Sequence, residues 1–233
     1  MGANPVPGAA RRLLIVGDSS AAGVGVTDQS EALSGQLIGA LEACGAMPRR
    51  WQLIARTGVA AAALPALIDQ GLAEGNVLDA SFDVALVVVG VNDVTGATPI
   101  GRWLTDLDRL HARLKGLGVG ATVFSGLPPM ERFIALPQPL RSWLGLAARR
   151  YDRALARWSA ARPDVFHHVL PRLDDRALLA PDGFHPSAAG CAFWARELTQ
   201  TLAPLLVPNP VADQGAAGSA GISRFTPESS IAT

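Results

Sequence analysis

Short apolar runs alternate with segments of helical periodicity from about residue 12 to residue 206. Residues 84–89 (Val-Ala-Leu-Val-Val-Val) predict the clearest strand, because they are apolar on both faces, as a central parallel strand must be. The other predicted strands are residues 13–16, 51–55, 121–124 and 165–169, and the predicted helices are residues 31–43, 60–72, 99–116, 140–161 and 186–202. This alternation predicts an α/β fold in three layers, a five-stranded parallel sheet with helices on both faces.

Several helix ends can also be predicted. Asp28 and Ser30 are possible caps of the first helix, and Thr98 is the expected N-cap of the third, with Pro99 at the first helical position. The 233 residues can bury one sizeable core, so we expect a short lead (residues 1–11), one domain (residues 12–207) and a disordered tail (residues 208–233) rich in Pro, Gly, Ala and Ser.

A candidate nucleophile follows the first predicted strand, where the apolar run stops at Gly17-Asp18-Ser19-Ser20. A serine hydroxyl is a poor nucleophile at neutral pH unless a base takes its proton and a third group orients that base. The alternative is that Asp18 and Ser19 only turn the chain or cap a helix. A Gly-x-Ser-x-Gly elbow is absent because Ala21 occupies its last position, which disfavours the α/β-hydrolase arrangement.

The candidate base and its carboxylate lie in Asp182-Gly183-Phe184-His185, directly before Pro186. A residue before proline is extended, which holds the imidazole of His185 at a loop-to-helix junction. Asp182 can reach back to Nδ1 and leave Nε2 free to accept the serine proton. The alternative is that Asp182 and Gly183 form a plain turn. The remaining histidines, His111, His167 and His168, are interpreted as structural.

Donors for an oxyanion are predicted at the ends of neighbouring strands. In open parallel sheets, ligands bind beyond the carboxyl ends of the strands, where Ser19, Gly58 and Asn92 all fall. The Ser19 N–H, the Gly58 N–H and the Asn92 amide could supply three donors to a tetrahedral intermediate. Gly90-Val91-Asn92-Asp93 could instead be a turn, and we expect Asp93 to support the loop.

Taken together, these residues resemble the SGNH (GDSL-type) hydrolases, a family of esterases and lipases. The matching blocks are Gly17-Asp18-Ser19-Ser20, Gly58, Gly90-Val91-Asn92-Asp93 and Asp182-Gly183-Phe184-His185-Pro186. Ser20 departs from the family's Gly-Asp-Ser-Leu at a position that does not react. The resemblance implies a flavodoxin-like fold, a catalytic Ser19, Asp182 and His185, an oxyanion hole of Ser19, Gly58 and Asn92, supporting roles for Asp18 and Asp93, and no metal or organic cofactor.

The substrate is less defined than the chemistry. Residues 127–143 follow the fourth strand, and their large apolar side chains form a possible acyl pocket or simply pack over the sheet edge: Met130, Phe133, Leu136 and Trp143. A short-chain ester, a lipid acyl ester, a thioester and an acetylated sugar all stay open as substrates of this small-molecule hydrolase. Two other classes are a non-catalytic flavodoxin-like binding module and a nucleotide or flavin protein, although Gly17, Gly23 and Gly25 form neither a Walker A motif nor Gly-x-Gly-x-x-Gly.

Net charge, apolar run length and cysteine content limit the expected partners and location of the protein. The net charge is zero and the pI is about 6.9, so the composition indicates neither a nucleic-acid surface nor an anionic-membrane surface. No apolar run is long enough for a transmembrane segment or a signal peptide, and a cytoplasmic location is the default expectation. Cys44 and Cys191 are expected to be buried free thiols. The oligomeric state is left open.

Overall fold

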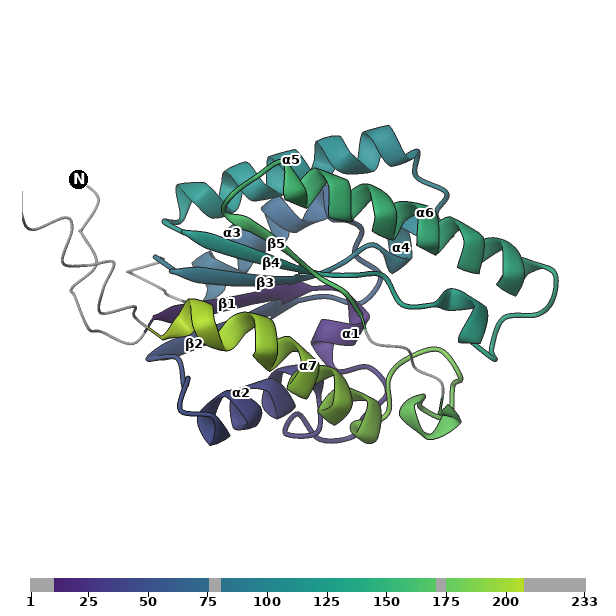
Figure 1. The fold of residues 1–233 in the computed structure, drawn as a ribbon, viewed down its shortest axis with the longest axis horizontal. Helices are drawn as coiled ribbons and strands as arrows, with labels where there is room; N and C mark the ends of the chain where they lie inside the picture. The colour runs from purple at the N-terminus through teal and green to yellow at the C-terminus, as the bar shows by residue number, and fades with distance from the viewer. Residues whose placement is uncertain (1–10, 76–80, 171–174, 208–233) are drawn as a thin grey trace, which may run out of the picture.

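The computed structural model describes residues 11–75, 81–170 and 175–207, which form a parallel sheet between two layers of helices (Figure 1). Within these residues the strands are β1 (Arg12–Gly17), β2 (Arg50–Ala55), β3 (Val84–Val88), β4 (Ala121–Ser125) and β5 (Val165–His168). Their order is β2-β1-β3-β4-β5, and each neighbouring pair is parallel. The predicted five-stranded α/β fold is confirmed.

Two hydrophobic cores cover the two faces of the sheet, because alternate residues of a strand point to opposite sides. Leu14 and Val16 contribute to the core shared with α3 (Leu64–Glu74), α5 (Ile100–Gly116) and α6 (Leu140–Ala160). Leu13 and Ile15 contribute to the core shared with α2 (Leu33–Ala43) and α7 (Ala188–Leu206). Figure 1 shows α3, α5 and α6 on one side of the sheet and α2 and α7 on the other.

The strand order determines where a ligand can bind. The chain passes from β1 outward to β2 and then returns to β3 on the other side of β1, so loops leaving β1 and β3 diverge. Such a switch point opens a crevice at the carboxyl ends of the strands in this topology. Two short helices begin there, α1 (Ser19–Ala22) directly after β1 and α4 (Val91–Thr95) after β3.

The structure corrects several predicted helix ends. α2 begins at Leu33, and neither Asp28 nor Ser30 caps it, because the N–H and hydroxyl of Ser30 both bond to the Asp28 carboxylate at 2.7 and 2.6 Å. α5 begins at Ile100 without a side-chain cap, so Thr98 was wrongly assigned as its N-cap. The Thr98 carbonyl instead accepts a hydrogen bond from the Tyr151 hydroxyl.

The last helix also differs from its prediction. α7 begins at Ala188 because Ser187, not Pro186, precedes its first turn, and the Ser187 hydroxyl accepts from the Gly190 N–H at 3.1 Å. It continues to Leu206 because Leu202 and Leu206 both bury against the sheet. Short 3-10 turns complete the described chain: η1 (Ala61–Ala63), η2 (Met130–Arg132) and η3 (Arg176–Leu178).

The two cysteines have different surroundings. Cys191 is buried in α7, where burial raises the pKa of its thiol to about 11. Cys44 is exposed at the end of α2, so the prediction that it is buried was wrong. The predicted tail lies outside the described residues, as does the predicted lead apart from Arg11. Among the described helices, none is long and apolar enough to cross a membrane.

Candidate active site

The loop after β1 is held against the sheet by its backbone and by the Asp18 side chain. The Asp18 N–H donates to the Val88 carbonyl at 3.0 Å, and its carboxylate accepts from the Ser20 N–H at 3.0 Å. Asp18 therefore does cap a helix, and this places Ser19 at the first position of α1 with 7% of its surface exposed. Burial raises the pKa of Asp18 to about 6, against the hydrogen bond from Ser20.

Ser19, His185 and Asp182 form a continuous hydrogen-bonded relay. Nε2 of His185 lies 2.9 Å from the Ser19 Oγ, and Nδ1 of the same ring lies 2.6 Å from Asp182 Oδ2. Asp182 Oδ1 accepts the backbone N–H groups of Phe184 and His185 at 2.9 and 3.0 Å. The residues that are 166 positions apart in sequence thus meet in the arrangement that serine activation requires.

The carboxylate of Asp182 is kept ionised by its hydrogen bonds. Burial raises its pKa, but the His185 ring and the N–H groups of Phe184 and His185 outweigh that effect, so the pKa lies below the ordinary value. The Ala180 N–H donates to the His185 carbonyl at 2.8 Å, which fixes the backbone of the loop. The negative Asp182 can therefore stabilise an imidazolium at His185 while setting its orientation.

The other three histidines have partners elsewhere. His111 lies 3.1 Å from the Asp164 carboxylate, and His167 lies 2.9 Å from the Asp152 carboxylate. His168 is buried, with Nδ1 2.9 Å from the Thr201 hydroxyl. None of these contacts involves Ser19, so His185 is the histidine that the fold brings to the serine.

The predicted oxyanion donors have hydrogen-bonding capacity left. One N–H of the Asn92 amide donates to the Val59 carbonyl at 3.0 Å, and a primary amide has a second N–H to offer. Gly58 is exposed, with φ of +77°, and a Cβ added there would meet nothing within 4 Å. Its backbone therefore faces open space at the end of β2. The Ser19 N–H is at the open end of α1.

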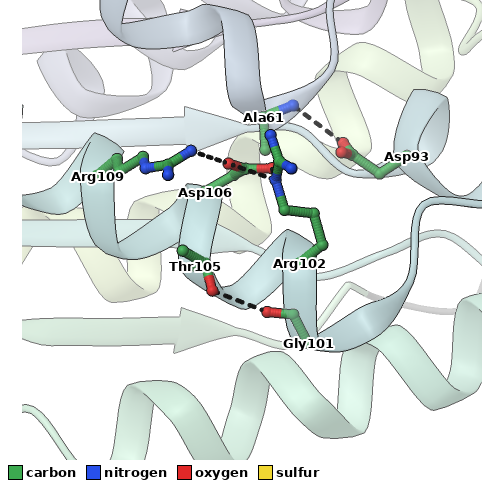
Figure 2. Close-up of polar contacts among 7 residues, drawn as sticks. All are labelled: Ala61, Asp93, Gly101, Arg102, Thr105, Asp106 and Arg109. Carbon is green, nitrogen blue, oxygen red and sulfur yellow. Dashed lines mark hydrogen bonds and ion pairs between the residues drawn. The ribbon is translucent and has the colours of Figure 1, made fainter.

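Asp93 ties α4 to the turn after β2, as Figure 2 shows. Its carboxylate accepts from the Ala61 N–H at 3.1 Å, and the residue is 1% exposed. Burial raises the pKa of Asp93 to about 6, the Ala61 N–H opposes this, and the charge of Asp106 adds to it. Asp106 is itself buried and is held by Arg102 and Arg109 at 3.1 and 3.0 Å.

Ser19 lines a mainly apolar pocket, and only one of the four predicted acyl-pocket residues lines it as well. Phe133 lines this pocket together with Ser19, but Met130 is fully buried in the core and Leu136 packs against that core. Trp143 is 55% exposed and lines a separate groove. The remaining lining of the Ser19 pocket is Asp18, Ser20, Val88, Val89, Val91, Ser125, Gly126, Pro128, Leu170, Leu179, Phe184, Pro186, Gly190 and Trp194.

Two residues near the relay were not singled out from the sequence as site residues. A Cβ on Gly25, whose φ is +107°, would lie 2.5 Å from the Pro186 carbonyl and 3.1 Å from the His185 Cβ. The loop after α1 can therefore pass this close to His185 and Pro186 only with glycine at this position. The Phe184 ring lies 5.1 Å from the His185 ring and 4.7 Å from the Phe133 ring, forming one wall of the pocket. The available signals were the third glycine of the first loop and the aromatic residue inside the Asp-to-His block.

The described residues include no group of three or more His, Cys, Asp or Glu side chains that could hold a metal ion.

Comparison with known proteins identifies the family. Residues 15–193 match the GDSL-like Lipase/Acylhydrolase family. A GDSL-like esterase of Mycobacterium tuberculosis is 30% identical in a match of 197 residues that covers 78% of this chain and 59% of that protein, so the chain spans about three fifths of its length.

Solved structures share the fold. The structure of TesA matches with a TM-score of 0.64 and 20% identity, covering 84% of this chain and 100% of that one. A family 3 carbohydrate esterase of Clostridium thermocellum matches with a TM-score of 0.63 and 17% identity, covering 89% and 99%. The resemblance seen in the sequence blocks is confirmed, and the chain belongs to the GDSL-like lipase/acylhydrolase family of ester hydrolases.

Proposed function

We propose that this protein is a serine esterase that hydrolyses carboxylic esters of small molecules, with residues 12–207 as its catalytic unit. The observation that carries the proposal is the relay from Asp182 through His185 to the Ser19 Oγ, with separations of 2.6 and 2.9 Å. Both distances are within hydrogen-bond reach, the geometric requirement for a general base acting on a nucleophile. Membership of an ester-hydrolase family supports the same assignment.

In the proposed reaction, the Ser19 Oγ attacks the ester carbonyl while Nε2 of His185 takes its proton. The negative charge that develops on the carbonyl oxygen is stabilised by the N–H groups of Ser19 and Gly58 and by the free N–H of Asn92. His185 then gives the proton to the departing alcohol, which leaves an acyl group on Ser19. A water molecule, deprotonated by His185, attacks the carbonyl of this acyl-enzyme. As the bond to Ser19 breaks and the carboxylic acid leaves, the imidazolium returns the proton to the Ser19 Oγ. Asp182 stabilises the imidazolium in both halves.

We place the acyl group in the pocket that Ser19 lines. Val91, Phe133 and Phe184 give this pocket apolar walls directly beside the nucleophile, as a site for a hydrocarbon group requires. Trp194 and Ser125 also line it, joined by a hydrogen bond of 3.2 Å from the indole Nε1 to the Ser125 Oγ. Of the four acyl-pocket residues predicted from the sequence, Phe133 is the one retained in this proposal.

A fluorophosphonate probe tests the nucleophile. The probe is expected to label Ser19 of the wild-type protein in intact-mass and peptide mass spectrometry, and Ser19→Ala should remove both the label and ester hydrolysis while circular dichroism stays unchanged. Loss of a triad nucleophile can cost on the order of 10⁶ in kcat. Ser30→Ala, on an exposed hydroxyl outside the relay, is the matched control and should keep full labelling. Residual hydrolysis by pure Ser19→Ala protein at the wild-type rate would refute the mechanism.

A substrate panel then separates the members of the proposed class. The same attack opens alkyl esters, thioesters and acetylated sugars, so these are compared at matched concentrations with acyl groups of increasing length. Phe133→Ala should enlarge the pocket and move the preference toward longer acyl groups. An unchanged preference would show that the acyl group binds elsewhere.

A further inference from the structure

Exposed apolar side chains gather on one segment beside the candidate active site. Among the described residues, eight large apolar side chains are exposed, and four of them lie between positions 134 and 146: Ile134, Leu140, Trp143 and Leu146. Their exposed fractions are 43% to 55%. Exposed apolar side chains scattered singly need no explanation, but four on one short segment indicate a surface with a partner.

The same helix carries a row of arginines. Trp143, Leu146, Arg150, Arg153 and Arg157 are spaced by three or four positions along α6, so they lie on one face of the helix, here called the α6 face. All five are exposed. Residues 140–162 contain six arginines and one aspartate, a net charge of +5 in a chain whose total is zero.

The positive charge of the α6 face is not neutralised by its neighbours. Within the described part of the chain, Arg150, Arg153 and Arg157 make no ion pair. The acidic residues nearby are engaged elsewhere, since Glu131 bonds Arg149 and Asp152 bonds His167. The α6 face is therefore apolar where the helix begins and cationic along the rest of its length.

The apolar segment that leads into α6 contacts the loop that carries Asp182. Ile134 packs against Gly183, where an added Cβ would lie 2.5 Å from the Ile134 Cγ1, and Gly183 is next to Asp182. Trp143, Leu146 and Arg150 line a groove together with Val94 of α4, the helix that carries Asn92. A molecule bound across Ile134 and the apolar start of the α6 face would thus lie beside both the Asp182 loop and α4.

We propose that the α6 face docks the protein on an anionic lipid surface. Tryptophan prefers the membrane–water interface, leucine and isoleucine can enter its apolar boundary, and arginines are attracted to anionic headgroups. Esters with apolar acyl groups concentrate in such surfaces, so docking would bring the candidate site of an ester hydrolase close to its substrates. The zero net charge does not predict this surface, because it averages a local positive charge with acidic residues elsewhere. The proposal concerns binding and does not depend on the chemistry proposed for Ser19.

Co-sedimentation with vesicles tests the docking. The full chain carrying Ser19→Ala, which cannot hydrolyse lipid by the proposed route, is mixed with large vesicles of phosphatidylcholine alone or of phosphatidylcholine with phosphatidylglycerol. We expect binding to the anionic vesicles that is lost at high salt, and little binding to the neutral ones. Arg150→Gln, Arg153→Gln and Arg157→Gln should each weaken the partition by about fivefold, and together by about 100-fold. Leu146→Ser should also weaken it.

Matched variants on other elements separate this surface from general charge attraction. The charge control combines Arg49→Gln, just before β2, with Arg50→Gln in β2 and Arg196→Gln in α7, which removes the same charge from exposed positions. The apolar control is Met47→Ser, which matches Leu146→Ser because both side chains are 43% exposed. These controls should keep wild-type binding. Equal loss in both triple variants, absence of binding to anionic vesicles, or equal binding to neutral vesicles would overturn the proposal. So would capture of poly-glutamate with the same arginine dependence in the absence of vesicle binding, since that outcome assigns the face to an acidic protein.

Discussion

Asp93→Asn is expected to change how folding stability depends on pH. Burial raises the pKa of Asp93 from 3.8 to about 6, although the Ala61 N–H opposes the shift. Between these two values the folded chain binds more protons than the unfolded chain, so Asp93 lowers the free energy of unfolding as the pH rises through this window, and the effect levels above pH 6. A difference of about 2 pKa units corresponds to about 3 kcal/mol, of which about 2 kcal/mol falls between pH 4.5 and pH 8.

The assay is urea unfolding of wild type and Asp93→Asn at several pH values in this range. Asparagine keeps an acceptor for the Ala61 N–H but cannot ionise, so the stability of the variant relative to wild type should improve by about 2 kcal/mol from pH 4.5 to pH 8. Any constant difference between the proteins reflects packing and does not enter the comparison. Asp28→Asn is the control with the opposite sign, because hydrogen bonds from Ser30 lower the pKa of exposed Asp28. A stability difference between wild type and Asp93→Asn that is independent of pH would refute the reasoning.

Three further substitutions test the site. Asn92→Ala should lower kcat by roughly 10²–10³ with little change in KM, because it removes an oxyanion donor; a raised KM with unchanged kcat would assign Asn92 to ground-state binding. Asp182→Asn should lower kcat by up to roughly 10⁴ with little change in KM, because it removes the carboxylate that orients the His185 ring and stabilises the imidazolium; wild-type kcat would contradict the relay. Gly25→Ala should lower both activity and the melting temperature, because its Cβ would lie 2.5 Å from the Pro186 carbonyl; wild-type activity would show that the loop yields without displacing His185.

The features that the sequence predicts best depend on local pattern. Parallel strands buried on both faces leave continuous apolar runs, so β3 was predicted within one residue of its observed end. The residues of the relay were assigned from their types and from their positions at strand and loop ends. The sheet then brings Ser19 and His185 together although 166 positions separate them. A parallel sheet aligns its loops at one edge, so positions relative to strands predict neighbours in space.

The features that the sequence predicts poorly depend on competition between partners. Ser30 and Asp28 hydrogen-bond to each other instead of capping α2. Both patterns are compatible with the same local sequence, so the sequence does not predict which one forms. The Thr98 carbonyl accepts a hydrogen bond from the hydroxyl of Tyr151, which is 53 positions away in sequence. In the proline-punctuated segment after β4, Met130 turns into the core while Trp143 stays exposed. Without a regular period, nothing in that segment assigns its apolar side chains to a pocket or to the core.

The loops of the candidate site are held mainly by backbone hydrogen bonds. The Asp18 N–H bonds the Val88 carbonyl, the Arg56 N–H bonds the Gly17 carbonyl at 3.2 Å, and the Ala180 N–H bonds the His185 carbonyl. These contacts require strands and turns of the right length but few particular side chains. Ser20 can therefore replace the leucine of the usual Gly-Asp-Ser-Leu block, since its own N–H still bonds Asp18 and its surface lines the pocket. The pocket walls, in contrast, are formed by side chains, so they can be substituted without breaking these backbone contacts.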